Sequence, residues 1–172
     1  MTLAKNPRSH LASVESLLVE QFRALQSLIS VTRAERSALV GANAAALLEL
    51  LPRKQALQAE LTRLEADRAE AVAAWGEAMA WTGVPLTLTE LIRHLEPDGA
   101  ERFRSLRQGV LALAQELKAL TQGNHSLALS ALERVAAVRD FMVSLSETSE
   151  GYQPWTGGRA RAGTLLTMEQ WA

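Results

Sequence analysis

Cysteine is absent from this 172-residue chain, and aromatic residues make up only 5% of it, with a single tyrosine. Without cysteine the chain has no disulfide bonds, no thiolate zinc sites and no cysteine nucleophile. The formal net charge is only -1, so no overall positive field draws the chain onto nucleic acid or onto an anionic membrane. These absences exclude much of the chemistry and polyanion binding that small proteins perform.

Long apolar runs are missing as well. No stretch approaches the roughly 20 consecutive apolar residues of a membrane-spanning helix. The N-terminal stretch "MTLAKNPRSHLASVESLL" lacks the uninterrupted apolar segment of a secretory signal. We therefore expect a cytoplasmic protein that neither inserts into a membrane nor binds nucleic acid.

Alanine and leucine dominate the composition, with Glu, Arg and Gln as polar partners, and these residues favour helix. Apolar residues recur at steps of three and four, and no useful strand-like alternation is present. Asn43 is suited to cap the second long helix, and either Thr87 or Thr89 to cap the short helix. The sequence predicts an all-α fold, an elongated antiparallel bundle of three long helices plus one short helix with coiled-coil-like packing. The expected divisions are an N-terminal tail (1–10), the helical bundle (11–148) and a flexible C-terminal tail (149–172).

The last helix has an unbroken heptad seam, which predicts that one face packs along the bundle. Gly123 interrupts this helix at a cost of about 1 kcal/mol relative to alanine. Asn124 lies on the seam, where a buried amide sets the register of the helices because a misaligned partner leaves it unsatisfied. The seam residues are Phe103, Leu106, Val110, Leu113, Leu117, Leu120, Asn124, Leu127, Ala131, Arg134, Val138, Phe141 and Leu145.

Two charged residues, Lys54 and Arg68, lie on the apolar seam of the second long helix. We expect their aliphatic stems to pack against the bundle while their charged ends reach water. Pro52 lies in the same helix, where a missing backbone donor and a steric clash predict a kink or a restart.

Residues with catalytic or metal-binding spacing are not found. The three histidines, His10, His94 and His125, are far apart and belong to no HExxH-type pattern. The glycine pair Gly157-Gly158 does not open a helix after a strand, as a phosphate-binding loop would. We therefore expect no enzyme activity, no metal and no cofactor.

The last helix carries more apolar surface after Gly123 than one interface needs. Besides the seam, two further rows follow helical spacing, which leaves two alternatives. Either the helix is buried on all sides within the bundle, or this surface binds an amphipathic segment of another protein. The rows consist of Leu129, Leu132, Ala136 and Val143 on the side opposite the seam, and of Ala128, Val135 and Met142 between them.

The stretch "GYQPWTGGRARAG", residues 151–163, follows this helix and combines glycine, proline and two large aromatic residues. Its composition favours disorder. The alternative is that Tyr152 and Trp155 fold back over the surplus apolar surface until a partner displaces them. The candidate partner-binding residues are Asn124, Leu127, Leu129, Leu132, Val135, Ala136, Met142, Val143, Tyr152 and Trp155.

The order of these motifs resembles that of the FlgN-type flagellar export chaperones over nearly the whole chain. The resemblance is carried by "LLELLPRKQALQAELTRLEADR", by "LTLTELIRHL" and by "LRQGVLALAQELKALTQGNHSLALSALERVAAVRDFM". Within them, Lys54 and Arg68 match a Lys-then-Arg pair of the family, and "GNHSLAL" matches an Asn-centred stretch. The tail segment "YQPWTGGR" is similar to the family's tail, although Pro52 and the tryptophan-rich tail depart from the family pattern.

This resemblance implies a cytoplasmic chaperone for the flagellar hook-associated proteins of the hook–filament junction. Such chaperones bind amphipathic C-terminal helices of their clients, prevent premature assembly and deliver the clients to the type III export gate. No nucleotide or metal is implied. The alternatives are a structural coiled coil that self-associates into a homo-oligomer, and an adaptor built on the same bundle.

Overall fold

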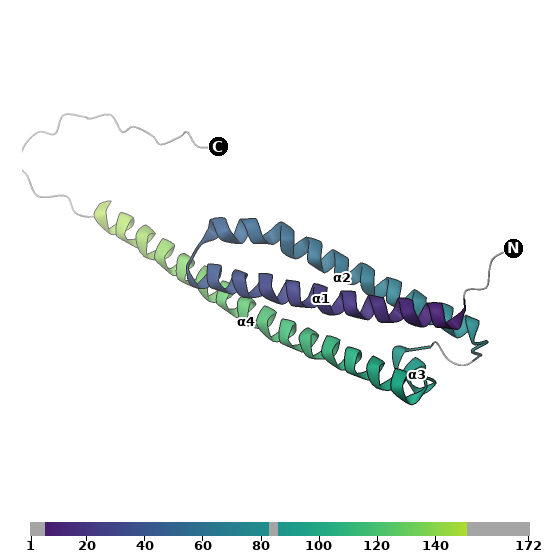
Figure 1. The fold of residues 1–172 in the computed structure, drawn as a ribbon. Coiled ribbons are helices and arrows are strands. Elements are labelled where there is room, and N and C mark those ends of the chain that lie inside the picture. Colours follow the sequence, from purple (N-terminus) through teal and green to yellow (C-terminus); the bar gives the residue numbers. More distant parts are fainter. Residues whose placement is uncertain (1–5, 83–85, 151–172) are drawn as a thin grey trace, which may run out of the picture. The chain divides into compact units, whose positions relative to one another are not determined.

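The computed structural model describes residues 6–82 and 86–150, which form four helices and no strand (Figure 1). They are α1 (Pro7–Val40), α2 (Ala44–Ala78), α3 (Leu88–Arg93) and α4 (Pro97–Glu150). The predicted all-α fold with three long helices and one short helix is confirmed. Helix α4 continues to Glu150, two residues beyond the predicted end of the bundle, and residues 151–172 lie outside the described part of the chain.

The helix starts follow local capping chemistry. Helix α1 begins at Pro7, four residues before the predicted start, because the Asn6 side chain accepts a hydrogen bond from the Arg8 backbone N–H at 3.1 Å. Proline suits the first turn, where its missing donor has no helical partner. The predicted cap Asn43 is confirmed, because its side chain accepts a hydrogen bond from Ala46 N at 3.0 Å. Of the two candidates for α3, Thr87 is the cap, since its side chain accepts from the Glu90 backbone N–H.

The cap of α3 also affects an acidic side chain. The Thr87 hydroxyl donates a hydrogen bond to the Glu90 carboxylate. This bond, supported by the positive charge of Arg93, holds the pKa of Glu90 below its ordinary value. The carboxylate therefore stays ionised in mildly acidic solution and remains available as an ion-pair partner for Arg93, whose Nη1 lies 2.9 Å from Glu90 Oε1.

The described residues divide into two compact units, one that ends at residue 132 and one that begins at residue 133. In the first unit, α1 and α2 form an antiparallel hairpin through the turn at residues 41–43. Contacts between α1 and α4 pair residues whose numbers rise together: Glu15 with Arg102, Phe22 with Gly109, and Arg33 with Glu116. Consecutive long helices are thus antiparallel, as expected, while α1 and α4 run parallel to each other.

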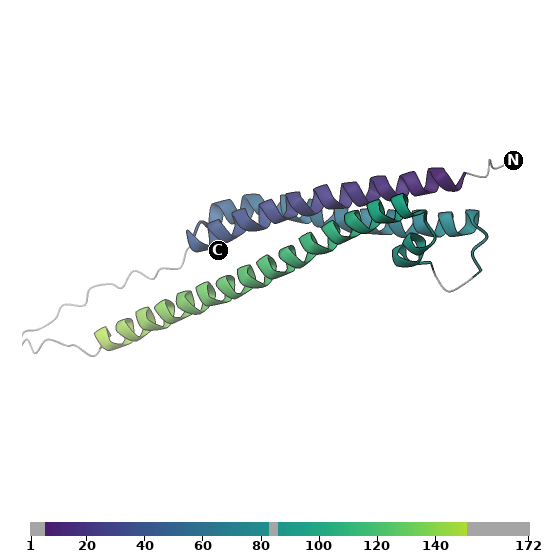
Figure 2. The same cartoon turned by 60° about the horizontal axis from the view of Figure 1, so that its bottom comes forward.

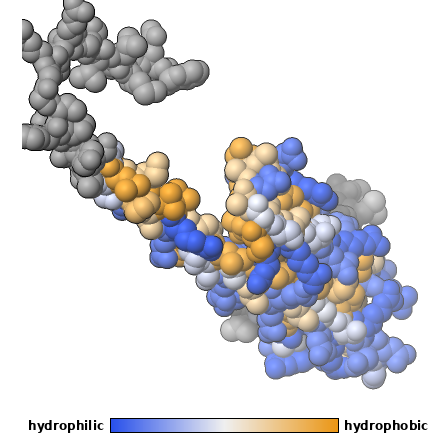
Figure 3. All heavy atoms as spheres, turned by 90° about the vertical axis from the view of Figure 1, so that its left-hand side faces the viewer, coloured by the Kyte–Doolittle hydropathy of each residue, from blue (hydrophilic) through white to orange (hydrophobic). Residues whose placement is uncertain are grey.

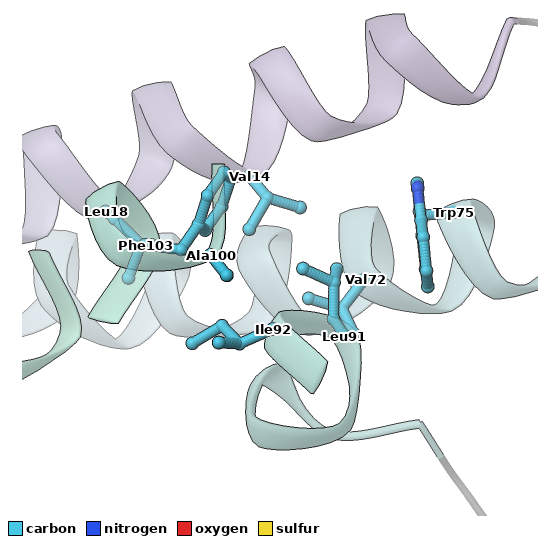
Figure 4. Close-up of a cluster of buried hydrophobic side chains, with 8 residues drawn as sticks. All are labelled: Val14, Leu18, Val72, Trp75, Leu91, Ile92, Ala100 and Phe103. Carbon is cyan, nitrogen blue, oxygen red and sulfur yellow. The ribbon is translucent and has the colours of Figure 1, made fainter. Parts of the chain in front are cut away.

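A buried hydrophobic cluster unites all four helices in the first unit (Figure 4). Each helix contributes two residues to it, and Leu91 of α3 is completely buried. A helix of six residues is not stable alone, so burial of Leu91 and Ile92 is what holds α3 in place. The cluster consists of Val14, Leu18, Val72, Trp75, Leu91, Ile92, Ala100 and Phe103.

Neither predicted weak point interrupts its helix. Helix α2 runs through Pro52, which is exposed, so the helix does not restart there. Helix α4 is continuous through Gly123, and its ribbon is unbroken in Figure 2. Hydrogen bonding on either side and packing in the first unit offset the local cost of these two residues.

Gly123→Ala is expected to raise the free energy of unfolding by about 0.5–1 kcal/mol, because alanine favours the helix more than glycine does. The added Cβ would lie 3.3 Å from Arg36 Nη1, the far end of a flexible side chain that moves at little cost. Urea denaturation followed by circular dichroism measures the change. A loss of stability would mean that Arg36 cannot give way.

Candidate functional site

A polar network joins the three long helices within the first unit. Lys54 Nζ of α2 donates to both carboxylate oxygens of Glu35 of α1, at 2.8 and 2.7 Å. Asn124 Nδ2 of α4 donates to Glu35 Oε2 at 2.9 Å and to the Thr32 carbonyl oxygen at 2.8 Å. One carboxylate therefore links a charged side chain of α2 with a buried amide of α4.

This network corrects the expectation for Lys54. Its side chain is only 17% exposed and its ammonium group is held by Glu35, so the charged end does not reach into water. A buried ammonium needs such a partner because desolvation without one is costly. For Asn124, the two hydrogen bonds to α1 support the predicted role in helix register, since a slip of α4 would leave the amide donors buried and unsatisfied.

Asn124 also carries an unused acceptor. The residue is only 4% exposed, and its Oδ1 atom is buried without a hydrogen-bond partner among the described residues. A buried acceptor in this state costs roughly 1–3 kcal/mol relative to a satisfied one. The side-chain amide of Asn124 thus uses its N–H donors, while its carbonyl oxygen accepts no hydrogen bond from the described residues.

A groove of about 410 Å³ lies beside the network, between α1, α2 and α4. Its walls are largely apolar, with a few polar groups at the network, a combination typical of binding sites. Leu48 and Leu51 of α2 line it and are at least half exposed. The lining residues are Glu35, Leu39, Leu47, Leu48, Leu51, Lys54, Thr121, Asn124, His125 and Ala128.

The part of α4 in the second unit exposes a run of large apolar side chains, which we call the distal apolar surface (Figure 3). At 100° per residue these side chains cover more than half of the helix circumference, wider than the stripe of an ordinary amphipathic helix. Val135 is 68% exposed and Met142 is 62% exposed. The surface consists of Val135, Val138, Phe141, Met142, Val143 and Leu145.

The structure separates the predicted partner-binding residues into groups. Asn124 is buried in the network, whereas Leu127 and Ala136 are half-buried. Leu129 and Leu132, in the first unit, are exposed, as are Val135, Met142 and Val143 in the second. Tyr152 and Trp155 lie outside the described residues.

Three members of the distal apolar surface, Val138, Phe141 and Leu145, were assigned by the heptad pattern to the seam that packs inside the bundle. Each is about half exposed or more in the structure. A repeat of apolar residues predicts that a face will be buried but does not say against what. Glu35 and Leu48 were also missed, because no local pattern marks the partner of a distant side chain.

The described ranges, 6–82 and 86–150, contain no cluster of three or more His, Asp or Glu side chains that would hold a metal ion. In those same ranges, no helix has the length and apolarity needed to cross a bilayer. What the geometry offers is apolar area: a groove at the polar network and a wide exposed surface on α4, both suited to helical or extended segments of another chain.

A protein-family model described as "FlgN protein" matches residues 1–157. The chain belongs to the FlgN family. This family comprises chaperones of flagellar protein export, so the resemblance seen in the sequence motifs is confirmed. The matched range contains all four helices, the groove and the distal apolar surface. Searches of curated proteins and of solved structures found no match.

Proposed function

We propose that this FlgN-family chain is a cytoplasmic, non-enzymatic chaperone for the hook-associated proteins of the hook–filament junction. It binds the amphipathic C-terminal helix of a client, prevents premature assembly and delivers the client to the type III export gate. Family membership supports a role in flagellar export. The observation that carries the binding step is the exposure of the distal apolar surface.

The proposed mechanism is competitive burial. Monomeric soluble proteins seldom expose several adjacent large apolar side chains unless these bind something. An amphipathic client helix would cover them with its own apolar face and lose its ability to pack against other copies of the client. No nucleotide or metal is needed, because the free energy comes from removing apolar area from water on both sides.

Residues outside the distal apolar surface extend the proposed site. Leu129 and Leu132 are exposed on the same helix, and Leu127, Ala136 and Asn124 complete the set that we assign to client binding. We further propose that residues 151–172 act as a tail in which Tyr152 and Trp155 cover apolar surface until a client displaces them. Their aromatic rings supply large apolar area with few rotatable bonds.

Self-association is the second candidate, since the same exposed side chains would also serve an interface between two copies of this chain. The two functions make different demands. A chaperone surface must release a second copy when a client helix arrives, whereas a structural coiled coil keeps its own copies together.

The test uses a labelled peptide that contains the C-terminal helix of a junction protein from the same genome. The full chain is titrated into this peptide, binding is measured by fluorescence anisotropy, and light scattering measures the oligomeric state. We expect saturable binding with a Kd of about 1–10 μM, the affinity of a modest helix interface, and loss of any homo-oligomer as the peptide binds. A control peptide with serine at its apolar positions should not bind. A stable oligomer that ignores the peptide would reject the chaperone in favour of the coiled coil.

A further inference from the structure

A second cavity of about 370 Å³ lies between α3 and the first part of α4, within the first unit and apart from the groove. Three of its six lining residues are arginines, and none is acidic. They come from two helices, since Arg93 belongs to α3 while Arg104 and Arg107 belong to α4. The complete lining is Thr89, Ile92, Arg93, Arg104, Arg107 and Gln108.

The positive charge of this arginine cavity is only partly neutralised. Arg93 pairs with Glu90 at 2.9 Å and Arg104 pairs with Glu101 at 3.1 Å, each through a single guanidinium nitrogen. Both arginines are more than half exposed, as is Glu101, while Glu90 is partly buried; ion pairs with an exposed partner are weak. Arg107 forms no ion pair or hydrogen bond within the described part of the chain. Two of the three guanidinium groups are thus each paired with one carboxylate, and the charge of Arg107 is not neutralised by an ion pair among the described residues.

Further groups shape the arginine cavity for a planar anion. Arg104 and Arg107 are three residues apart, so they lie on the same face of α4. Thr89 and Gln108 add neutral hydrogen-bond donors, and Ile92, which is 6% exposed, adds an apolar wall. Guanidinium groups bind carboxylates through two parallel hydrogen bonds, and the apolar wall suits the methylene groups of an acidic side chain.

We propose that this cavity binds glutamate or aspartate side chains of an acidic peptide segment of a partner protein. The site shares no residue with the distal apolar surface, so the two partners do not compete for the same side chains. An extended polyanion fits less well, because the chain has a net charge of only -1. The α4 part of the cavity also lies about two turns beyond the start of that helix at Pro97, away from the free backbone N–H groups of α4 that would favour phosphate.

The experiment titrates the full chain into a fluorescein-labelled eight-residue peptide with six glutamates around two central leucines. A matched peptide carries glutamine at the six positions. We expect saturable binding of the acidic peptide at low salt and none of the glutamine peptide. Arg107→Gln should weaken binding about tenfold, and Arg107→Lys, which keeps the charge but loses the planar fork, about threefold.

Arg63→Gln is the control, because Arg63 is an exposed α2 arginine paired with Asp67 and remote in sequence from the cavity. Its affinity should equal that of the unmodified chain, and the side-chain Nε–Hε signals of Arg93, Arg104 and Arg107 should shift on binding. Equal losses in Arg63→Gln and Arg107→Gln, or no saturable binding, would overturn the proposal. So would tighter Arg107-dependent binding of inorganic phosphate or of phosphatidylglycerol vesicles than of the peptide. Circular dichroism verifies that the variants, all at exposed positions, remain folded.

Discussion

Val135→Glu is expected to lower the affinity for a client's C-terminal helix by about a hundredfold while the helical circular dichroism signal stays unchanged. Burying a carboxylate in an apolar interface without a partner costs about 2–3 kcal/mol or more, and each 1.4 kcal/mol is a factor of ten in Kd. Val135 is 68% exposed in the free chain, so the new charge remains in water and leaves folding intact. Anisotropy with the labelled client peptide measures the affinity.

Ala137→Glu is the matched control for this prediction. Ala137 is also exposed, lies on the same helix and receives the same charge, but it is about 160° around the helix from Val135. Its glutamate should change the affinity less than threefold. Equal losses in the two variants would indicate a general charge effect. If Val135→Glu removed only self-association and left peptide binding intact, the surface would be an interface between copies of this chain.

Glu35→Ala is expected to lower the free energy of unfolding by about 2 kcal/mol. It leaves the ammonium of Lys54, 17% exposed, without its partner and removes one of the two acceptors of Asn124. Breaking a fully buried ion pair costs 3–5 kcal/mol, and partial exposure of both side chains reduces this figure because water screens the remaining charge. Urea denaturation measures the loss.

Two further variants make this result specific. Glu116→Ala breaks the pair with Arg33, whose side chains are 41% and 64% exposed, and should cost less than about 1 kcal/mol. Adding Lys54→Met to Glu35→Ala should restore part of the stability, because it removes the unpaired charge and leaves an apolar side chain in the same space. If Glu35→Ala lowered the free energy of unfolding no more than Glu116→Ala, the ammonium of Lys54 would be hydrated in the variant, in line with the expectation from the sequence that its charged end reaches water.

The local features of the fold were predictable because they depend on neighbours in the chain. Helical spacing of alanine and leucine identified the helices, and the side chains of Asn43 and Thr87 marked two of their starts. The start of α1 was placed too late, since apolar spacing begins after its capping residue, Asn6, has already ordered the first turn. Family membership was also readable from the order of the motifs.

Features that depend on distance through space were not predictable in this way. Lys54 was expected in water because its partner Glu35 lies 19 residues away on another helix. The arginine cavity exists only because α3 packs beside α4 and brings Arg93 near Arg104 and Arg107. Phe141 and Leu145 follow the heptad pattern but remain exposed.

By itself, the sequence determined the helix types, the starts of α2 and α3, the family and the presence of surplus apolar surface, because propensity, capping and spacing act over a few residues. The tertiary structure alone decided which charges are paired, which helices run parallel and which apolar residues stay in contact with water. The physical reason is that burial and ion pairing depend on groups that only folding brings together. The local pattern of residues along one sequence does not give the distances between side chains on different helices.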